Sequence, residues 1–135
     1  MKFFFNILFM CTIFSSFGVF KVIGNDLDAV ICNAMKGMQA QEEKKIPYNI
    51  GEFELIGITV DCKKKALITE KKHIQYSLSD FSEDFKINVT KNWKNANCKN
   101  MIFNTNTGWS TTQIIQDTKK KVVLKLEANF EICSQ

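Results

Sequence analysis

The chain has 135 residues, of which 18 are basic and 14 acidic, so its formal net charge is +4 at pH 7. Every basic residue is a lysine. Because the arginine fork supplies most bidentate contacts to bases and phosphates, this composition argues against specific nucleic-acid binding. Without its first 24 residues the chain keeps roughly 110, enough for one domain with one core.

The first 24 residues are typical of a secretory signal peptide. Lys2 precedes an apolar run from Phe3 to Phe14 that is too short to span a bilayer. Small residues suited to cleavage follow at positions 15, 16 and 18, and polar sequence begins at Asn25. The pattern predicts an exported protein of the periplasm or the extracellular space, with a single domain over residues 25–135.

The cysteines divide between the signal peptide and the mature chain. Lipidation of Cys11, in the signal peptide, is an alternative that we do not favour, because Met10 is bulkier than the residue that normally precedes a lipidated cysteine. Four cysteines remain, an even number that favours structural disulfides after export: Cys32, Cys62, Cys98 and Cys133. The nearest two are 30 residues apart, unlike the close pairs of zinc and redox sites. We expect no metal and no cofactor.

The first half of the mature chain predicts a helix and then a hairpin. An apolar stripe at helical spacing consists of Leu27, Val30, Ile31, Ala34, Met35 and Met38. This helix must end before Pro47, because the residue before proline avoids the helical region. From Gly51 the period changes to two, and a strand with a bulge next to Gly57 continues to Cys62. A second extended stretch, residues 66–78, places on one face Ile74, Tyr76 and Leu78.

The second half repeats this order. Asp80 and Glu83 resemble a capping box, and the helix that they would open has a predicted buried face of Phe81, Phe85, Val89, Trp93 and Ala96. A short turn at residues 101–103 and a strand over residues 109–116 follow. The last strand alternates strictly, with an apolar face of Val122, Leu124, Leu126, Ala128, Phe130 and Ile132.

The order helix, hairpin, helix, hairpin predicts an α+β fold of two layers, in which a four-stranded antiparallel sheet carries both helices on one face. Cys32 lies on the first predicted helix and Cys62 at the end of the first strand. Cys98 ends the second helix and Cys133 ends the last strand. Among the three possible connectivities we therefore expect Cys32–Cys62 and Cys98–Cys133, each tying a helix to the sheet.

Two features are candidates for function. His73 is the sole histidine, so a serine or cysteine nucleophile would depend on it. Its neighbours Lys71 and Lys72, and its phase opposite to Ile74 and Tyr76, predict an exposed strand face. Two lysine triplets lie at predicted hairpin turns: Lys63, Lys64, Lys65 and Lys119, Lys120, Lys121. If both turns lie at one end of the sheet, they form a basic rim suited to an anionic protein or membrane; solvated turns are the alternative. Trp109 ends a polar loop and is either a binding anchor or a core residue.

A succession of features in the second half has a counterpart in known proteins. A strand with Tyr76 is followed by a helix ending at Cys98, then by Gly108, a strand, a polar turn and an alternating strand with Cys133 near its end. This resembles cystatin-like or related α+β modules of small exported bacterial proteins. The resemblance implies fold and compartment, and it transfers no active-site residue. The cysteines of the first half depart from its simplest version.

The expected function is non-enzymatic binding of a protein partner, in the manner of a periplasmic inhibitor or an immunity-type protein. Two alternatives stay open at this point. One is a secreted effector or small hydrolase that uses His73. The other is an envelope component that contacts anionic surfaces through the lysine-rich turns.

Overall fold

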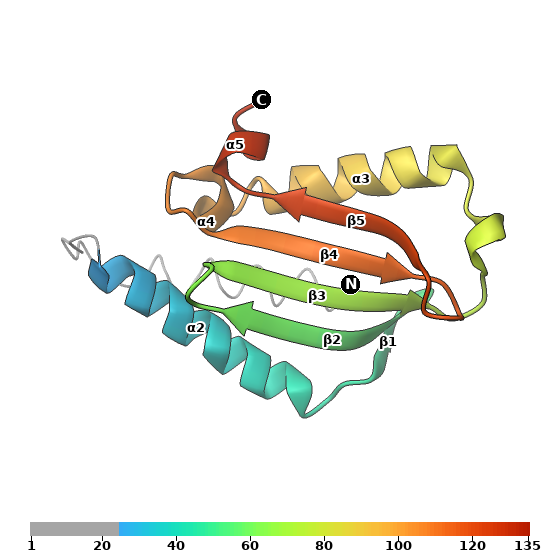
Figure 1. Ribbon diagram of the computed structural model, residues 1–135, viewed down its shortest axis with the longest axis horizontal. Coiled ribbons are helices and arrows are strands. Elements are labelled where there is room, and N and C mark those ends of the chain that lie inside the picture. Colours follow the sequence, from blue (N-terminus) through green and yellow to red (C-terminus); the bar gives the residue numbers. More distant parts are fainter. Residues whose placement is uncertain (1–24) are drawn as a thin grey trace.

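A five-stranded sheet forms the centre of residues 25–135, the part of the chain that the computed structural model describes (Figure 1). The predicted signal peptide, with Cys11, lies outside this part. The strands are ordered β1-β2-β3-β4-β5 across the sheet. In chain order the elements are α2 (Asn25–Glu43), β1 (Tyr48–Ile50), β2 (Phe53–Asp61), β3 (Ala66–His73), η1 (Leu78–Asp80), α3 (Glu83–Asn97), α4 (Met101–Asn104), β4 (Ser110–Gln116), β5 (Val122–Ala128) and α5 (Phe130–Cys133).

The α+β class is as expected, but the sheet is mixed and not antiparallel throughout. β3 and β4 are parallel, and the other neighbouring pairs are antiparallel. The chain leaves β3, returns through α3 and α4, and starts β4 beside the start of β3, where the Ser110 N–H donates to the Lys65 carbonyl over 2.9 Å. Alternation of side chains is the same in parallel and antiparallel strands, so the sequence pattern does not distinguish them. The fifth strand, β1, has three residues, too few to show a period.

Three predicted boundaries are wrong because polar side chains end or begin an element locally. β3 ends at His73 and not at residue 78. α3 is capped by Ser82, whose Oγ accepts from the Phe85 N–H. Asp80 lies within η1, where its side chain accepts from the N–H of the N-cap residue Ser77. β5 ends before Asn129, whose side chain caps α5, so the last alternating residues belong to a helical turn. The bulge next to Gly57 is confirmed by a register shift between Leu55 and Gly57.

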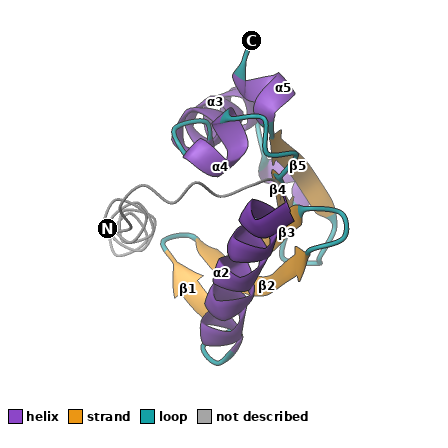
Figure 2. Cartoon of the chain, turned by 90° about the vertical axis from the view of Figure 1, so that its left-hand side faces the viewer, coloured by secondary structure: helices purple, strands orange, loops and turns teal. Residues whose placement is uncertain are grey.

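Both long helices lie on the same side of the sheet, as expected (Figure 2). α2 contributes Ile31 and Met35 to a buried cluster with Val60 of β2 and Trp109. The register pairs Val60 with Leu67, which lies on the same face of β3 as His73. Phe81, at the entry to α3, meets the His73 ring with centroids 5.4 Å apart. α2 packs mainly on β2 and α3 mainly on β5, so the central strands lie between them.

Two disulfides join the pairs that the cysteine positions favour. Cys32–Cys62 ties α2 to the end of β2, with Cα atoms 5.5 Å apart. Cys98–Cys133 ties the end of α3 to α5, and not to a strand, with Cα atoms 5.3 Å apart. Because disulfides persist in oxidising compartments, they agree with export, and the protein is exported. Within residues 25–135, no helix is both long and apolar enough to cross a membrane.

Candidate functional site

Two segments meet at the end of the sheet where β3 finishes and β4 turns into β5. We call residues 74–80 and 117–122 together the loop-end surface. The Thr118 N–H donates to the Tyr76 carbonyl over 3.1 Å, and the Leu78 N–H donates to Asp117 Oδ2 over 3.0 Å. These two bonds hold the segment after β3 against the β4–β5 turn, so their side chains form one surface.

Asp117 organises the turn from a buried position. Its other oxygen, Oδ1, accepts the backbone N–H groups of Lys119 and Lys121, each over 2.8 Å. Burial raises the pKa of the Asp117 carboxyl, but the N–H groups of Lys121, Lys119 and Leu78 lower it, and the resulting pKa is below the ordinary value. Asp117 is not among the residues that the sequence nominated for a function. An aspartate directly before a polar run is the signal that identifies such a side-chain acceptor.

His73 is fully buried, so its predicted exposure is wrong. The prediction used the phase of Ile74 and Tyr76, but β3 ends at His73 and the later residues no longer indicate a strand face. The imidazole stacks on the Tyr76 ring, with centroids 4.4 Å apart and planes at 14°. Phe53 and Phe81 contact the same ring edge-on. An aromatic cluster therefore fixes the start of the loop-end surface.

The hydrogen bonds of His73 oppose a role as a general base. Nδ1 accepts the N–H groups of Gln75 over 3.1 Å and Tyr76 over 3.0 Å, which places the ring proton on Nε2. Nε2 is buried and has no hydrogen-bond partner, and Glu52 Oε2 lies 3.8 Å from it, beyond hydrogen-bond distance. A general base needs a free nitrogen lone pair facing the nucleophile. The ring instead holds the chain that follows β3.

The loop-end surface exposes apolar side chains beside lysines. Lys119, Lys120 and Lys121 are all exposed on the turn. The large apolar residues around them are 40–57% exposed: Ile74 40%, Leu78 43%, Tyr76 44% and Val122 57%. A hollow of about 350 Å³ lies between the segments and is lined by Ser77, Leu78, Ser79, Asp117, Lys119 and Lys121. Apolar and cationic groups thus share one surface.

The other lysine triplet lies at the opposite end of the sheet, so the predicted basic rim of six lysines is wrong. Lys63, Lys64 and Lys65 follow β2 and precede β3, whereas the β4–β5 turn follows β4. Because β3 and β4 are parallel, the start of β3 and the end of β4 lie at opposite ends. The backbone N–H groups of Lys63 and Lys64 both donate to Asp61 Oδ1, each over 3.0 Å.

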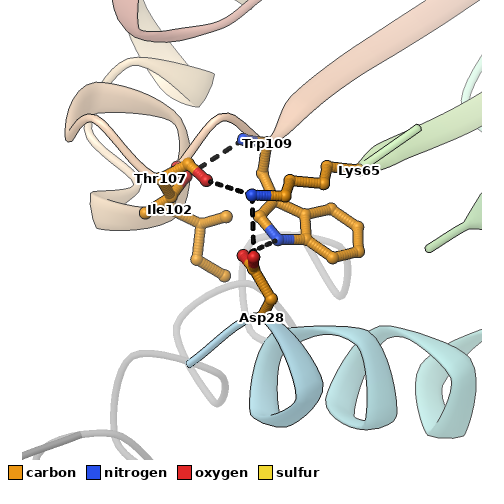
Figure 3. Close-up of polar contacts among 5 residues, drawn as sticks. All are labelled: Asp28, Lys65, Ile102, Thr107 and Trp109. Atoms are coloured by element: carbon orange, nitrogen blue, oxygen red, sulfur yellow. Dashed lines mark hydrogen bonds and ion pairs between the residues drawn. The ribbon is translucent and has the colours of Figure 1, made fainter. Parts of the chain in front are cut away.

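Lys65 and Trp109 anchor α2, and Figure 3 shows their shared partner. Lys65 Nζ lies 2.7 Å from Asp28 Oδ2, and the Trp109 indole N–H donates to Asp28 Oδ1 over 3.3 Å. The hydrogen bond from Lys65 is the main cause that lowers the pKa of the Asp28 carboxyl. Trp109 is 1% exposed, so of its two proposed roles the structure shows the core position. Gly108 before it has a φ of 78°, which a residue with a Cβ rarely adopts.

α3 presents a second candidate surface because its apolar row is incompletely covered. Phe85, Val89 and Trp93 recur at the i, i+4 spacing of one helix side, and each is partly exposed. No residue of this 15-residue helix is buried, although the helix packs on β5. Ile87, on another side of α3, is 62% exposed. An amphipathic helix normally buries such a row against its own domain.

Metal chemistry finds no support in the part of the chain that the structure describes. Over residues 25–135, His, Cys, Asp and Glu side chains do not gather in groups of three or more that could hold an ion. The four cysteines there are all in disulfides.

The fold, but not the sequence, has counterparts among known proteins. No family model and no curated protein matches the chain. A "putative secreted protein" of Pseudomonas aeruginosa is similar in structure, with a TM-score of 0.60 and 15% identity over 78% of this chain and 95% of the other. The pilotin EpsS of the Vibrio vulnificus type 2 secretion system is similar with a TM-score of 0.53 and 10% identity, over 82% of this chain and 94% of the pilotin. At such identities the likeness shows a shared fold. None of these structures tests the resemblance to cystatin-like modules, which stays a prediction.

Proposed function

We propose that this exported protein is not an enzyme and that it binds a protein partner through the side of α3 that carries Phe85, Val89 and Trp93. The observation that carries the proposal is the absence of any buried residue in α3 despite this apolar row. Partly exposed aromatic residues are enriched where proteins bind one another. A partner that covers the row would remove apolar surface from water.

Two further observations support a binding role. The single histidine is engaged by two backbone N–H groups, which leaves it unsuited to activate a nucleophile. One of the similar structures is a pilotin of a type 2 secretion system, so the fold occurs in a protein of a secretion system. The finer roles, a periplasmic inhibitor or an immunity-type protein, stay predictions.

Site-specific photocrosslinking in the cells of origin tests this proposal. A photoreactive residue at position 89 should crosslink to one envelope protein, whereas the same residue at position 87, on another side of α3, should not. With that partner purified, Val89→Glu should weaken binding by roughly 30-fold, the effect of removing a hot spot of about 2 kcal/mol. Ile87→Glu is the matched control and should bind normally.

Two results would reject the role of α3. One is equal crosslinking from positions 87 and 89, and the other is a Val89→Glu protein that binds its partner with normal affinity. Because Val89 is partly buried, the urea midpoint of each variant must be compared with that of the parent chain. Val89→Ala provides a milder change of the same side chain if the glutamate variant is unstable.

A further inference from the structure

We propose that the loop-end surface binds anionic membrane lipid, with the lysines of the β4–β5 turn over the headgroups and the neighbouring apolar side chains in the interface. This inference is independent of the proposed role of α3, which uses a different element. It rests on the composition, exposure and rigidity of residues 74–80 and 117–122.

The first step is the chemistry of the exposed groups. Three consecutive lysines lie beside one aromatic and three aliphatic side chains, and each of these four is at least 40% exposed. Aliphatic groups enter the acyl boundary of a membrane, tyrosine occupies the interface, and lysine extends its ammonium group to the headgroups. The chain has no arginine, so lysine supplies all of its positive charge.

The size and composition of the patch favour lipid over a protein partner at this surface. The four apolar residues, each 40–57% exposed, make a small patch, whereas a stable protein interface uses about 20–30 residues a side. Lysine is also depleted where proteins bind one another. An anionic bilayer needs no shape complementarity, and it attracts each nearby lysine separately.

The acidic groups of these two segments do not cancel the lysines at the tip. The Asp117 carboxylate is buried and faces three backbone N–H groups. Asp80 accepts the N–H and O–H groups of Ser77, each over 2.7 Å. Asp80 is itself exposed, so the three lysines leave the two segments with a net positive charge that is smaller than their own.

The surface is also held in shape before it meets a ligand. Asp117 joins the turn to Leu78, and the buried His73 ring fixes the backbone at Tyr76. A preorganised surface loses less conformational entropy on binding than a mobile loop does. The same bonds explain why apolar side chains remain outward, since their backbones are fixed at the end of the sheet.

Vesicle sedimentation of the chain 25–135, the part that the structure shows folded, tests the proposal. We expect binding to vesicles of phosphatidylethanolamine with phosphatidylglycerol and no binding to phosphatidylcholine alone. Each lysine at an anionic surface contributes about fivefold to affinity, so Lys119→Gln with Lys120→Gln should weaken binding by roughly 25-fold. Lys63→Gln with Lys64→Gln removes the same charge at the opposite end of the sheet and should change binding by less than about twofold.

A second pair of variants tests the apolar part. Leu78→Ser should weaken binding to the phosphatidylglycerol vesicles severalfold, and Ile87→Ser on α3 should not. The proposal is wrong if the parent chain does not sediment with these vesicles, or if the two lysine pairs lose binding equally. It is also wrong if the lysine variants weaken binding but Leu78→Ser does not, because adsorption by charge alone needs no apolar patch. A chain that binds a soluble protein through Lys119 and Lys120 but ignores vesicles would equally overturn it.

Discussion

The two disulfides close loops of nearly equal length, so their removal separates chain entropy from packing. The sequence separations are 30 and 35 residues, for which the chain-entropy model gives about 3.7 and about 3.8 kcal/mol. Cys32 and Cys62 also pack on the buried cluster under α2. Cys98 and Cys133 join α3 to α5, two helices without a buried residue. The lost sulfur contacts of the first pair add roughly 1 kcal/mol.

We therefore expect Cys32→Ala with Cys62→Ala to lower the free energy of unfolding by about 5 kcal/mol. Cys98→Ala with Cys133→Ala should lower it by about 4 kcal/mol. The first loss approaches the whole stability of many small domains, so that variant is expected to be largely unfolded at 37 °C. Urea denaturation of both double variants and the parent chain, with equal slopes required for comparison, measures the difference. If removal of Cys98–Cys133 lowers the free energy of unfolding by less than about 1 kcal/mol, the loop-closure argument is refuted. Equal losses would refute the packing argument.

The remaining predictions concern the groups that shape the two ends of the sheet. His73→Phe keeps an aromatic ring but leaves two backbone N–H groups without their acceptor, so it should lower the free energy of unfolding in urea by about 2–4 kcal/mol. His73→Asn keeps an acceptor at the same place and should lower it less. A greater loss for His73→Asn than for His73→Phe would contradict this role of the ring. Because the pKa of Asp117 is lowered on folding, its carboxylate stabilises the fold above the unfolded pKa, about 3.9, and this stability is lost as pH falls through the folded pKa. Asp117→Asn should therefore flatten the loss of stability below about pH 4, and an unchanged acid profile would exclude this carboxylate as its source. Gly108→Ala should cost about 1–2 kcal/mol, because its φ is +78° and the new Cβ would lie 3.4 Å from Lys65 Cδ; a neutral effect in thermal unfolding would show that the turn relaxes.

The likeness to the two similar structures is a likeness of fold. The similar structures share 15% and 10% of their residues with this chain, while the matched length is most of each chain. One fold can carry many different sets of surface residues and therefore many unrelated functions. The binding surfaces proposed here therefore rest on α3 and on the loop ends of this chain.

Local pattern was sufficient to predict most elements and the disulfide partners. The apolar stripe of α2 and the alternation in β2 and β5 follow directly from the 3.6 and 2.0 residue periods. The bulge at Gly57 was visible as a phase slip in the same pattern. Each cysteine lies near the end or edge of such an element, which made Cys32–Cys62 and Cys98–Cys133 the favoured pairs.

Strand direction and the position of the loops depended on tertiary structure. The residues of β3 and β4 alternate in the same way in either direction, and only the return of the chain through α3 and α4 makes them parallel. The parallel direction of β3 and β4 places the two lysine triplets at opposite ends of the sheet, with Lys119–Lys121 beside Leu78. The burial of His73 has a similar cause, since it depends on where β3 ends and on Phe53 and Phe81 from other elements.

The sequence by itself determined the compartment, the class of fold and most of the helices and strands, because these depend on contacts and periods within short segments. Only the tertiary structure decided which charged and apolar groups share a surface. Contacts such as Leu78 with Asp117, or Asp28 with Trp109, join residues 39 and 81 positions apart. No local period encodes a contact at that separation, because it exists only once the sheet has brought its distant segments together.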